Sequence, residues 1–462
     1  MKKRVGMILA ITLIVASLLL PENRYLTAAG MHTVCLLLSF LVMLVTEALP
    51  VVVTSLIYCG IMPLLGVTEN LGEALIGYSQ PIVFFTLASF GIAAALTTIP
   101  LSQRILLSML RAFGKDIYSV LLAMMAACAL FSSIVSNVPT CAIFMAIALQ
   151  FLDLYKNEED RKRSARAFMI AIPVASMIGG MMTPAGSSVN LIAISQLEAN
   201  TGTAISFVQW MCAGIPLAVI MTPLAWFLIS RIYKPALVSR EQIDQFIDAV
   251  SEQVPSKMGV QEIKVLIIIG VMLVLWVSSS WFPIFNVMIV ATLGCCVMFL
   301  PGIDVLDVDT FLRENSWDAF FLVGTVLSIS NAMIRNGVSD CIAGIIPSLK
   351  LPAPALIAFT AAMIFSFLVI IPVATSLVPI LSSALIAMAQ GAGVSPALIM
   401  MTAAICACNC YLLPLDTVPL ITYSKGYYSM TDMAKSTFFM QLAIILLSAL
   451  WLPVVGKIFG FL

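Results

Sequence analysis

The sequence predicts an all-α polytopic membrane protein with about 11 transmembrane helices and two re-entrant hairpins. Hydrophobic residues make up 61% of the 462 residues and charged residues only 10%, whereas a soluble chain carries about 25% charged residues. Apolar segments recur along the whole chain, and each is a candidate for crossing a bilayer. Two proline-containing polar breaks, at 132–140 and 371–376, interrupt this apolar sequence.

The first break, residues 132–140, lies between the apolar runs 119–131 and 141–152. Both runs are shorter than the roughly 20 residues that a spanning helix needs. Irregular backbone at bilayer depth is tolerated only where it is buried in protein or lines a cavity. We therefore expect a re-entrant hairpin whose tip reaches a binding site, rather than a loop between two spanning helices. The break at 371–376 predicts a second hairpin of the same kind.

Apart from the hairpins, the candidate transmembrane segments lie at 5–20, 31–48, 51–66, 81–98, 167–197, 205–230, 263–281, 284–300, 317–334, 396–424 and 437–456. The first lies within residues 1–30 and follows three basic residues, as in a signal peptide. Because no small-x-small cleavage site follows it, we expect a retained first transmembrane helix. Residues 101–116 are predicted to form an amphipathic surface helix, because Arg104, Arg111 and Lys115 recur at helical spacing opposite apolar residues.

The distribution of basic residues supports this layout. With Lys2 on the cytoplasmic side, nineteen of the 23 Lys and Arg residues face the cytoplasm, and only Arg24, Arg335, Lys350 and Lys457 lie outside. This is the asymmetry that the positive-inside rule describes, and treating either hairpin as a single span would remove it. We expect a multi-pass protein of the plasma or inner membrane, with its N-terminus in the cytoplasm.

Composition also excludes several kinds of function. The formal net charge is zero, which gives no indication of nucleic-acid binding. His32 is the only histidine, so His-based hydrolysis and His-rich metal sites are excluded. Cys406, Cys408 and Cys410 form a C-x-C-x-C motif. A metal site is one interpretation, but small packing residues are the preferred one, because no histidine or acidic ligand lies alongside.

The two halves of the chain carry similar patterns in the same order. Residues 31–230 and 264–462 are separated by the polar segment 231–263, which we expect to be a cytoplasmic linker. The sequence P-A-G-S at 184–187 corresponds to P-L-D-T at 414–417. With an odd number of spans in each half, the two repeats are inverted. Inverted repeats with interrupted helices at matched positions are typical of secondary transporters.

Helix breaks are predicted at 179–190 and 413–419. The first contains three glycines and a proline, which disfavour helix. Unwound carbonyls there suit a cation, and the N-terminus of the following half-helix suits an anion; close helix packing through small residues is the alternative. The second break contains Asp416, and an acid within a span by default marks an ion or proton path. Capping of the following half-helix is the alternative role, and both roles are compatible.

Four stretches of the chain resemble motifs of the divalent-anion/sodium symporters, the family that carries dicarboxylates, citrate or sulfate. Residues 46–50 resemble T-E-A-[IL]-P, and residues 136–140 resemble S-N-T-A-T with V-P in place of the inner T-A. Residues 179–192 resemble G-G-x-x-T-x-x-G-[ST]-P-P-N-L-I, and residues 413–433 resemble L-P-x-A-T-P-P-N…G-Y…D-M. The resemblance covers essentially the whole chain in matching order and identifies it as a divergent member.

This resemblance implies a scaffold domain and a transport domain that moves as an elevator, usually within a homodimer. It implies a sodium site built by Ser132, Ser136, Asn137 and the backbone at Gly186. It places substrate contacts at the hairpin tips and the helix breaks, on Ser136, Asn137, Thr140, Ser187, Thr375 and Thr417. The second S-N-T motif is missing, and Asp416 stands where the family has a small residue. We therefore hypothesise that Asp416 is a protonatable coupling site or a cation ligand.

Together these observations predict a secondary active transporter of small divalent organic anions, of the C4-dicarboxylate or citrate type, with an elevator alternating-access mechanism. Coupling to sodium, coupling to protons and exchange are the alternatives for its energy source. A carrier of an inorganic anion such as sulfate is the second interpretation. An intramembrane enzyme is the third, although the chain has neither G-x-S-x-G nor H-E-x-x-H. The expected partners are the anionic substrate, the lipid bilayer and a second copy, with sodium as co-substrate, no other cofactor and no nucleic acid.

Overall fold

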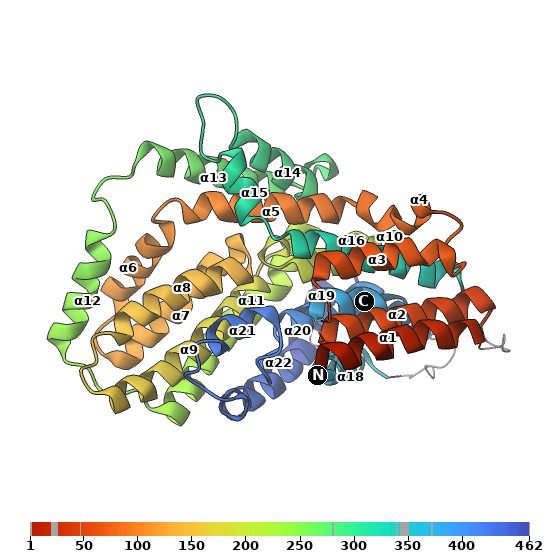
Figure 1. Ribbon diagram of the computed structural model, residues 1–462. Helices are drawn as coiled ribbons and strands as arrows, with labels where there is room; N and C mark the ends of the chain where they lie inside the picture. Colours follow the sequence, from red (N-terminus) through yellow and green to blue (C-terminus); the bar gives the residue numbers. More distant parts are fainter. Residues whose placement is uncertain are drawn as a thin grey trace.

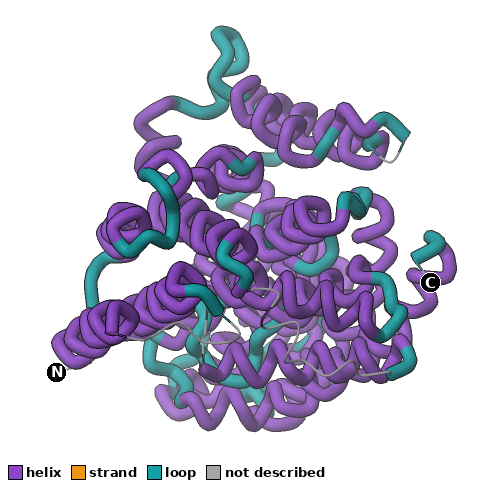
Figure 2. Tube along the Cα trace, turned by 90° about the vertical axis from the view of Figure 1, so that its right-hand side faces the viewer, coloured by secondary structure: helices purple, strands orange, loops and turns teal. Residues whose placement is uncertain are grey.

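The computed structural model describes residues 2–19, 26–46, 48–279, 281–338, 341, 351–370 and 373–461. These residues form α-helices and short 3₁₀ turns, and no strand occurs among them (Figure 1). The predicted all-α class is confirmed. The view turned by 90° places the two ends of the chain on opposite sides of the molecule (Figure 2). Glu47 of the T-E-A-L-P motif and Ile371 and Pro372 of the second hairpin tip lie outside the described residues.

The helices of the first half of the chain are α1 (Lys2–Leu19), α2 (Ala28–Thr46), α3 (Val51–Leu64), α4 (Leu71–Ala74), α5 (Pro81–Thr97), α6 (Leu101–Phe113), α7 (Ile117–Val135), α8 (Asn137–Leu152), α9 (Glu158–Gly180), α10 (Ser188–Thr201) and α11 (Phe207–Tyr233). Those of the second half are α12 (Arg240–Glu252), α13 (Val260–Ser278), α14 (Val287–Val297), α15 (Val308–Glu314), α16 (Trp317–Arg335), α18 (Ala353–Ile370), α19 (Ala374–Gly391), α20 (Pro396–Cys408), α21 (Thr417–Tyr423) and α22 (Met430–Ile458). The 3₁₀ turns are η1 (Ile76–Ser79), η2 (Pro184–Gly186) and η3 (Pro283–Phe285).

Five of the described helices are long and apolar enough to cross a membrane, namely α7, α11, α13, α16 and α22. Helices α5 and α6 are bent by 63° at the break between them and would make a sixth span if taken together. Seven further apolar helices have 10–17 residues, including α3, α8 and α20. Two short apolar helices joined by a break are typical of a membrane span that is interrupted within the bilayer. The expected number of about 11 spans stays a prediction.

The two predicted hairpins occupy matching positions in the packing. Helices α7 and α8 contact each other and α9, and α8 also contacts α21. In the same way, α18 and α19 contact each other and α20, and α19 also contacts α10. Each half-helix that follows a break, α10 or α21, therefore packs against the hairpin of the other half of the chain. The packing places both breaks, the first hairpin tip and the described part of the second tip, residues 373–376, in one region of the fold.

The first hairpin tip is tighter than the sequence suggested. Helix α7 continues to Val135 and α8 begins at Asn137, so Ser136 alone, with φ 90° and ψ 154°, breaks the helix. The polar residues around it remain helical because their hydroxyls bond to backbone carbonyls nearby: Ser133 Oγ donates to Leu130 O at 2.7 Å and Thr140 Oγ1 donates to Ser136 O at 2.7 Å. The arms are therefore longer than expected from apolar runs alone, at 19 and 16 residues, and α7 is long enough to cross a membrane, so the expectation that both arms are too short to span is wrong for α7.

A smaller cluster of buried apolar side chains, separate from the main hydrophobic core, joins α1, α2, α3 and α16. The close approach of η1 to α16 fixes one side of this cluster. A Cβ at Gly77 would lie 2.2 Å from Gly324 O, so a larger residue there would separate the two elements. The backbone N–H of Gly77 donates to Ser328 Oγ at 3.0 Å, and Tyr78 Oη donates to Phe321 O at 3.0 Å. This unit is built from residues far apart in the chain.

The polar segment 231–263 contains a short amphipathic helix, α12, that lies beside α6 (Figure 1). Its buried residues are Ile243, Phe246 and Val250, and the Phe246 ring packs edge-on against Phe151 with centroids 5.0 Å apart. Helix α12 thus buries its apolar face against α8, one arm of the first hairpin. The linker is tied to the rest of the fold rather than extended into solvent.

An ion pair between Arg104 of α6 and Glu262 at the start of α13 holds this corner together. Both guanidinium Nε and Nη2 bond to the Glu262 carboxylate, the latter at 3.0 Å, and Nη2 also donates to Pro255 O at 2.9 Å. The Glu262 residue is only 2% exposed. A bidentate pair of this kind satisfies a carboxylate that would otherwise be buried without a partner.

We expect Arg104→Ala to destabilise the protein strongly, because the buried Glu262 carboxylate would lose its counter-charge. Breaking a buried ion pair from one side costs about 3–5 kcal/mol of unfolding free energy. The thermal midpoint of the purified protein in detergent measures the effect. Arg313→Ala is the control, because the Arg313–Glu314 pair is exposed on both sides and such pairs contribute about 0–1 kcal/mol. Equal midpoints for the two variants would contradict the prediction.

Candidate functional site

The break between α9 and α10 is held by side chains that bond to its unwound backbone. Asn190 Nδ2 donates to Gly180 O at 2.8 Å and to Thr183 O at 2.9 Å. Thr183 Oγ1 accepts from Gly186 N at 3.0 Å and donates to Ser133 O at 2.7 Å. These bonds replace those that the helix gives up, as buried backbone requires. The unwound residues are 181–187, inside the predicted 179–190.

Asn137 is the first residue of α8 and lies directly against this break. The Ser132 hydroxyl is 2.9 Å from Asn137 Oδ1 and 2.8 Å from the backbone carbonyl oxygen of Ser176, and it donates to one of them. Ser176 Oγ donates to the backbone carbonyl of Asn137 at 2.7 Å. Ser132, Asn137 and Ser176 are all buried. The hairpin tip and helix α9 are therefore joined by a compact polar cluster.

The carboxamide of Asn137 is placed so that either of its two ends can face the same set of oxygens. One end points at Ser132 Oγ, Ser176 O and Gly186 O, at 2.9, 3.0 and 3.2 Å. If this end is the nitrogen, it donates to these oxygens. If it is Oδ1, four oxygens converge, and carbonyl, amide and hydroxyl oxygens are the ligands that a hard cation prefers. The other end of the carboxamide lies 3.4 Å from Cys408 Sγ.

In the second break, between α20 and α21, Asp416 caps the half-helix α21. Its Oδ1 accepts from the Val418 N–H at 3.3 Å and from Thr417 Oγ1 at 3.0 Å. The backbone N–H of Ala374, in the second hairpin tip, also lies close enough to interact with this carboxylate. Asp416 is partly exposed. The capping role is thus observed, and it leaves the carboxylate facing the second tip.

The structure brings most of the predicted site residues together. Ser132, Asn137 and Gly186 meet directly, and Ser187 and Asp416 both lie near Cys408. The hydroxyls of Thr140 and Thr417 are engaged locally, with Ser136 O and Asp416. Ser136 supplies the turn between the two arms, and Thr375 is half-buried in the first turn of α19.

Three residues of this cluster were not predicted as site residues, although Gly180 lies within the predicted break 179–190. Ser176 contributes a hydroxyl and a carbonyl, and Gly180 lies one helical turn later, where its missing side chain leaves room for the Asn137 carboxamide. Their spacing of four residues, which places them on one helix face, is the signal that could have found them. Cys408 was interpreted as a packing residue, and its place beside Asn137 follows only from the fold.

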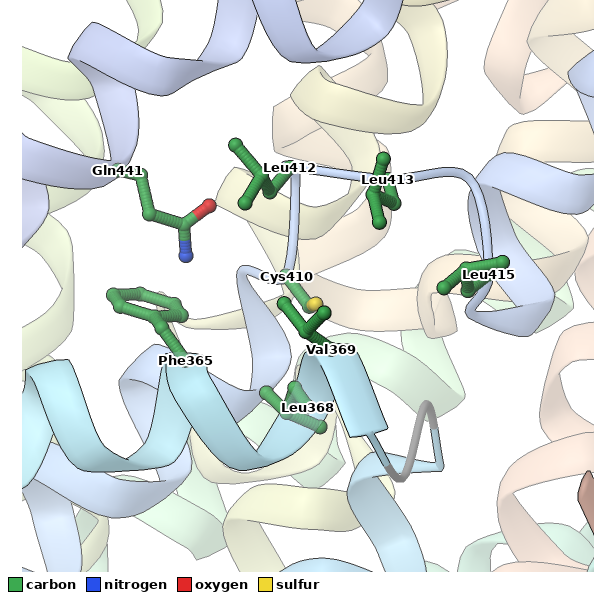
Figure 3. A pocket seen from close by; sticks show the side chains of 8 residues that line it. All are labelled: Phe365, Leu368, Val369, Cys410, Leu412, Leu413, Leu415 and Gln441. Atoms are coloured by element: carbon green, nitrogen blue, oxygen red, sulfur yellow. The ribbon is translucent and has the colours of Figure 1, made fainter. Parts of the chain in front are cut away.

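A small cavity of about 20 Å³ lies behind the second break. Figure 3 shows the loop with Cys410, Leu412, Leu413 and Leu415 above it, the residues of α18 below, and the Gln441 amide at one side. Such a volume holds about one water molecule. None of the predicted site residues lines this cavity, and its walls are mainly apolar, so it is separate from the polar cluster.

Comparison with known proteins agrees with these features. The family described as "Sodium:sulfate symporter transmembrane region" matches residues 1–462. The sodium-dependent dicarboxylate transporter SdcS of Staphylococcus saprophyticus is 25% identical over 465 residues, covering 95% of this chain and 88% of the relative. SdcS of Staphylococcus aureus is also 25% identical, over 471 residues, with the same coverage of both chains.

Among solved structures, the YdaH transporter of Alcanivorax borkumensis has a similar fold. Its TM-score is 0.53 at 12% sequence identity, and the match covers 85% of this chain and 88% of that one. At this identity the likeness concerns the fold alone. The prediction of a polytopic membrane protein that is a transporter rather than an enzyme is confirmed. The chain belongs to the sodium:sulfate symporter family, as a divergent member.

Proposed function

We propose that this protein is a secondary active transporter that couples the movement of a small divalent organic anion to sodium. The observation that carries the proposal is the oxygen set around Asn137, with Ser132 Oγ, Ser176 O and Gly186 O within 3.2 Å of one end of its carboxamide. Sodium would be held there by uncharged oxygens, with Ser136 supplying the turn. The relatives named as sodium-dependent dicarboxylate transporters support both the ion and the substrate class.

The anion would be bound on the side of the cluster that faces the second break. Ser187 lies before the first turn of α10, Asn137 and Thr140 lie in the first turn of α8, and Thr375 lies in the first turn of α19. The N-termini of these helices carry partial positive charge and unpaired N–H groups, which suit carboxylates. Thr417 adds a hydroxyl from the other half of the chain. The carboxylates of the anion would then be met by hydroxyls, N–H groups and the bound sodium.

The second half would hold its cation differently. Asp416 corresponds to Gly186 in the repeat, and the second tip, which lacks an Asn-like residue, has Ala374 beside the Asp416 carboxylate. In the first half the hairpin tip supplies a side-chain oxygen and the break supplies a carbonyl. In the second half the break would supply the side-chain oxygen instead. We propose that this carboxylate ligates a second cation or carries a proton.

The architecture proposed for transport is two inverted repeats, 31–230 and 264–462, in a transport domain and a scaffold domain that move as an elevator. The reciprocal packing of α10 on α19 and of α21 on α8 supports a repeat in which the halves interlock. The separate apolar cluster of α1, α2, α3 and α16 supports a second unit that stays fixed. A homodimer in the plasma or inner membrane, with a cytoplasmic N-terminus, completes the proposal.

Uptake into proteoliposomes tests this function. Labelled succinate and labelled sulfate are offered separately, with sodium, proton and counter-substrate gradients varied one at a time. We expect succinate uptake to require an inward sodium gradient and to be competed by dicarboxylates more strongly than by sulfate. If sulfate is transported faster than succinate, the proposal of a divalent organic anion as substrate is wrong and an inorganic anion takes its place. If uptake is driven only by protons or counter-substrate, the proposal of sodium coupling is wrong.

Ser132→Ala tests the cation site itself. The variant removes one oxygen from the set, and we expect the sodium concentration for half-maximal uptake to rise about tenfold, the order expected for one lost hydrogen-bonding ligand. Ser133→Ala is the matched control, because this neighbouring hydroxyl bonds only to Leu130 O of its own helix. The proposal is rejected if both variants keep the sodium dependence of the unaltered protein.

A further inference from the structure

Cys408 occupies an unusual place for a thiol, between the first hairpin tip and both helix breaks. It ends α20 and is only 3% exposed. Its Sγ lies 3.4 Å from Asn137 Nδ2 and 3.6 Å from the carbonyl oxygen of Met177, to which it donates. The Ser187 hydroxyl and the Asp416 carboxylate also lie near it. No other cysteine among the described residues makes a hydrogen bond to a residue of the polar cluster.

A thiol differs from most side chains in that it is both a weak donor and a weak acceptor. When its proton points at Met177 O, its lone pairs face Asn137 and can accept an amide N–H. When its proton turns toward Asn137, it can donate to an amide oxygen instead. Cys408 can therefore pair with either end of the Asn137 carboxamide without moving its sulfur.

We propose that the Asn137 carboxamide turns over with sodium occupancy, and that Cys408 is the positioning residue that pairs with it in both orientations. This inference rests on the proposed sodium site. With sodium bound, Oδ1 faces the ion together with Ser132 Oγ, Ser176 O and Gly186 O, and Nδ2 donates to Cys408 Sγ. Without sodium, Nδ2 donates to that oxygen set, and Oδ1 accepts the Cys408 S–H.

Each arrangement leaves no amide atom without a partner, which matters because an unpaired buried polar group costs about 1–3 kcal/mol. The turnover also links the two halves of the chain. Cys408 immediately precedes the loop that leads to Asp416 and Thr417, so the occupancy of the first cation site changes a hydrogen bond at the start of the second break.

Three variants test the inference by sodium-dependent uptake. Cys408→Met keeps a sulfur acceptor but has no proton to donate, so only the sodium-free orientation loses its partner, and we expect the half-saturating sodium concentration to fall about fivefold, as for one lost hydrogen bond. Cys408→Ala removes one hydrogen bond from each orientation, and its half-saturating sodium concentration should lie between those of Cys408→Met and the unaltered protein. Cys406→Ala is the matched control, because Cys406 is equally buried on the same helix and makes no hydrogen bond to the cluster.

Infrared difference spectra of the unaltered protein, sodium minus choline, provide a second readout that packing alone would not move. The S–H stretching band should shift with sodium, and the shift should disappear in Cys408→Ala but remain in Cys406→Ala. An S–H spectrum that does not respond to sodium, in a protein whose uptake requires sodium, overturns the inference and leaves the proposed function intact. Uptake that is independent of sodium in the unaltered protein overturns both, and the two failures are thus distinguishable.

Discussion

Gly180→Ala is expected to lower sodium-coupled uptake roughly a hundredfold, because overpacking a buried site costs about 1–3 kcal/mol and each 1.4 kcal/mol is a factor of ten. A Cβ at this position would lie 1.9 Å from Asn137 Oδ1, 2.6 Å from its Cγ and 2.7 Å from its Nδ2. The carboxamide cannot simply move aside, since Ser132 Oγ on α7 contacts it and Ser176 Oγ on α9 holds the backbone carbonyl of Asn137. The new methyl group would therefore displace Asn137 from the oxygen set.

The stability of the Gly180→Ala protein should fall much less than its uptake, because alanine favours helix over glycine by about 1 kcal/mol. Gly60→Ala in α3 is the matched control, since a Cβ there would meet no atom within 4 Å. Sodium titrations of uptake, with thermal midpoints of both purified variants, separate loss of the site from loss of the fold. Sodium-dependent uptake by Gly180→Ala at the level of Gly60→Ala would show that Asn137 does not act in the proposed way.

Asp416→Asn is expected to weaken ion coupling about tenfold or more, the order of a hydrogen bond or ligand bond made by a charged group. Asparagine is as good an N-cap as aspartate, so α21 should keep the bonds that Asp416 now accepts from Val418 and Thr417. Only the charge is removed. Uptake is measured as a function of sodium at fixed pH and as a function of pH at fixed sodium, and the dependence that becomes shallower identifies the ion that Asp416 handles.

Asp307→Asn serves as the control for this substitution. Asp307 caps α15 in the same way, accepting from Thr310 N at 2.8 Å, but it lies outside the polar cluster. The Asp307→Asn substitution should leave the dependence of uptake on sodium and on pH unchanged. If Asp416→Asn also leaves both unchanged, Asp416 is a helix cap and nothing more, and the proposal of a second cation or proton site fails.

The fold class and the positions of the interruptions could be predicted because they depend on local properties of the chain. Low charge and recurring apolar segments indicate a membrane protein, and glycine and proline disfavour helix wherever they gather. The break at 181–187 fell within the predicted 179–190. The second break spans 409–416 rather than 413–419, because α20 ends at Cys408, ahead of the proline that marked the break in the sequence.

The hairpin tip shows the limit of local reasoning. Residues 132–140 looked like an extended polar break, yet only Ser136 leaves the helical conformation. Ser and Thr hydroxyls can donate to backbone carbonyls of their own helix, which gives the hydroxyl a partner without breaking the helical bonds, so a polar composition does not by itself unwind a helix. Pro139 falls in the first turn of α8, where proline does not disrupt helical bonding.

By itself the sequence determined that the chain is a multi-pass α-helical transporter of this family, and its resemblance to that family predicted that Ser132, Asn137 and Gly186 form one site, residues that the structure places side by side. These conclusions follow from composition and from motifs whose residues lie close together in the chain. Only the tertiary structure decided that Ser176, Gly180 and Cys408 complete the cluster, and that Ala374 lies beside Asp416. Contacts between residues far apart in the chain, such as the 3.4 Å approach of Cys408 to Asn137, depend on how α20 packs beside the first hairpin, and no local pattern encodes that distance.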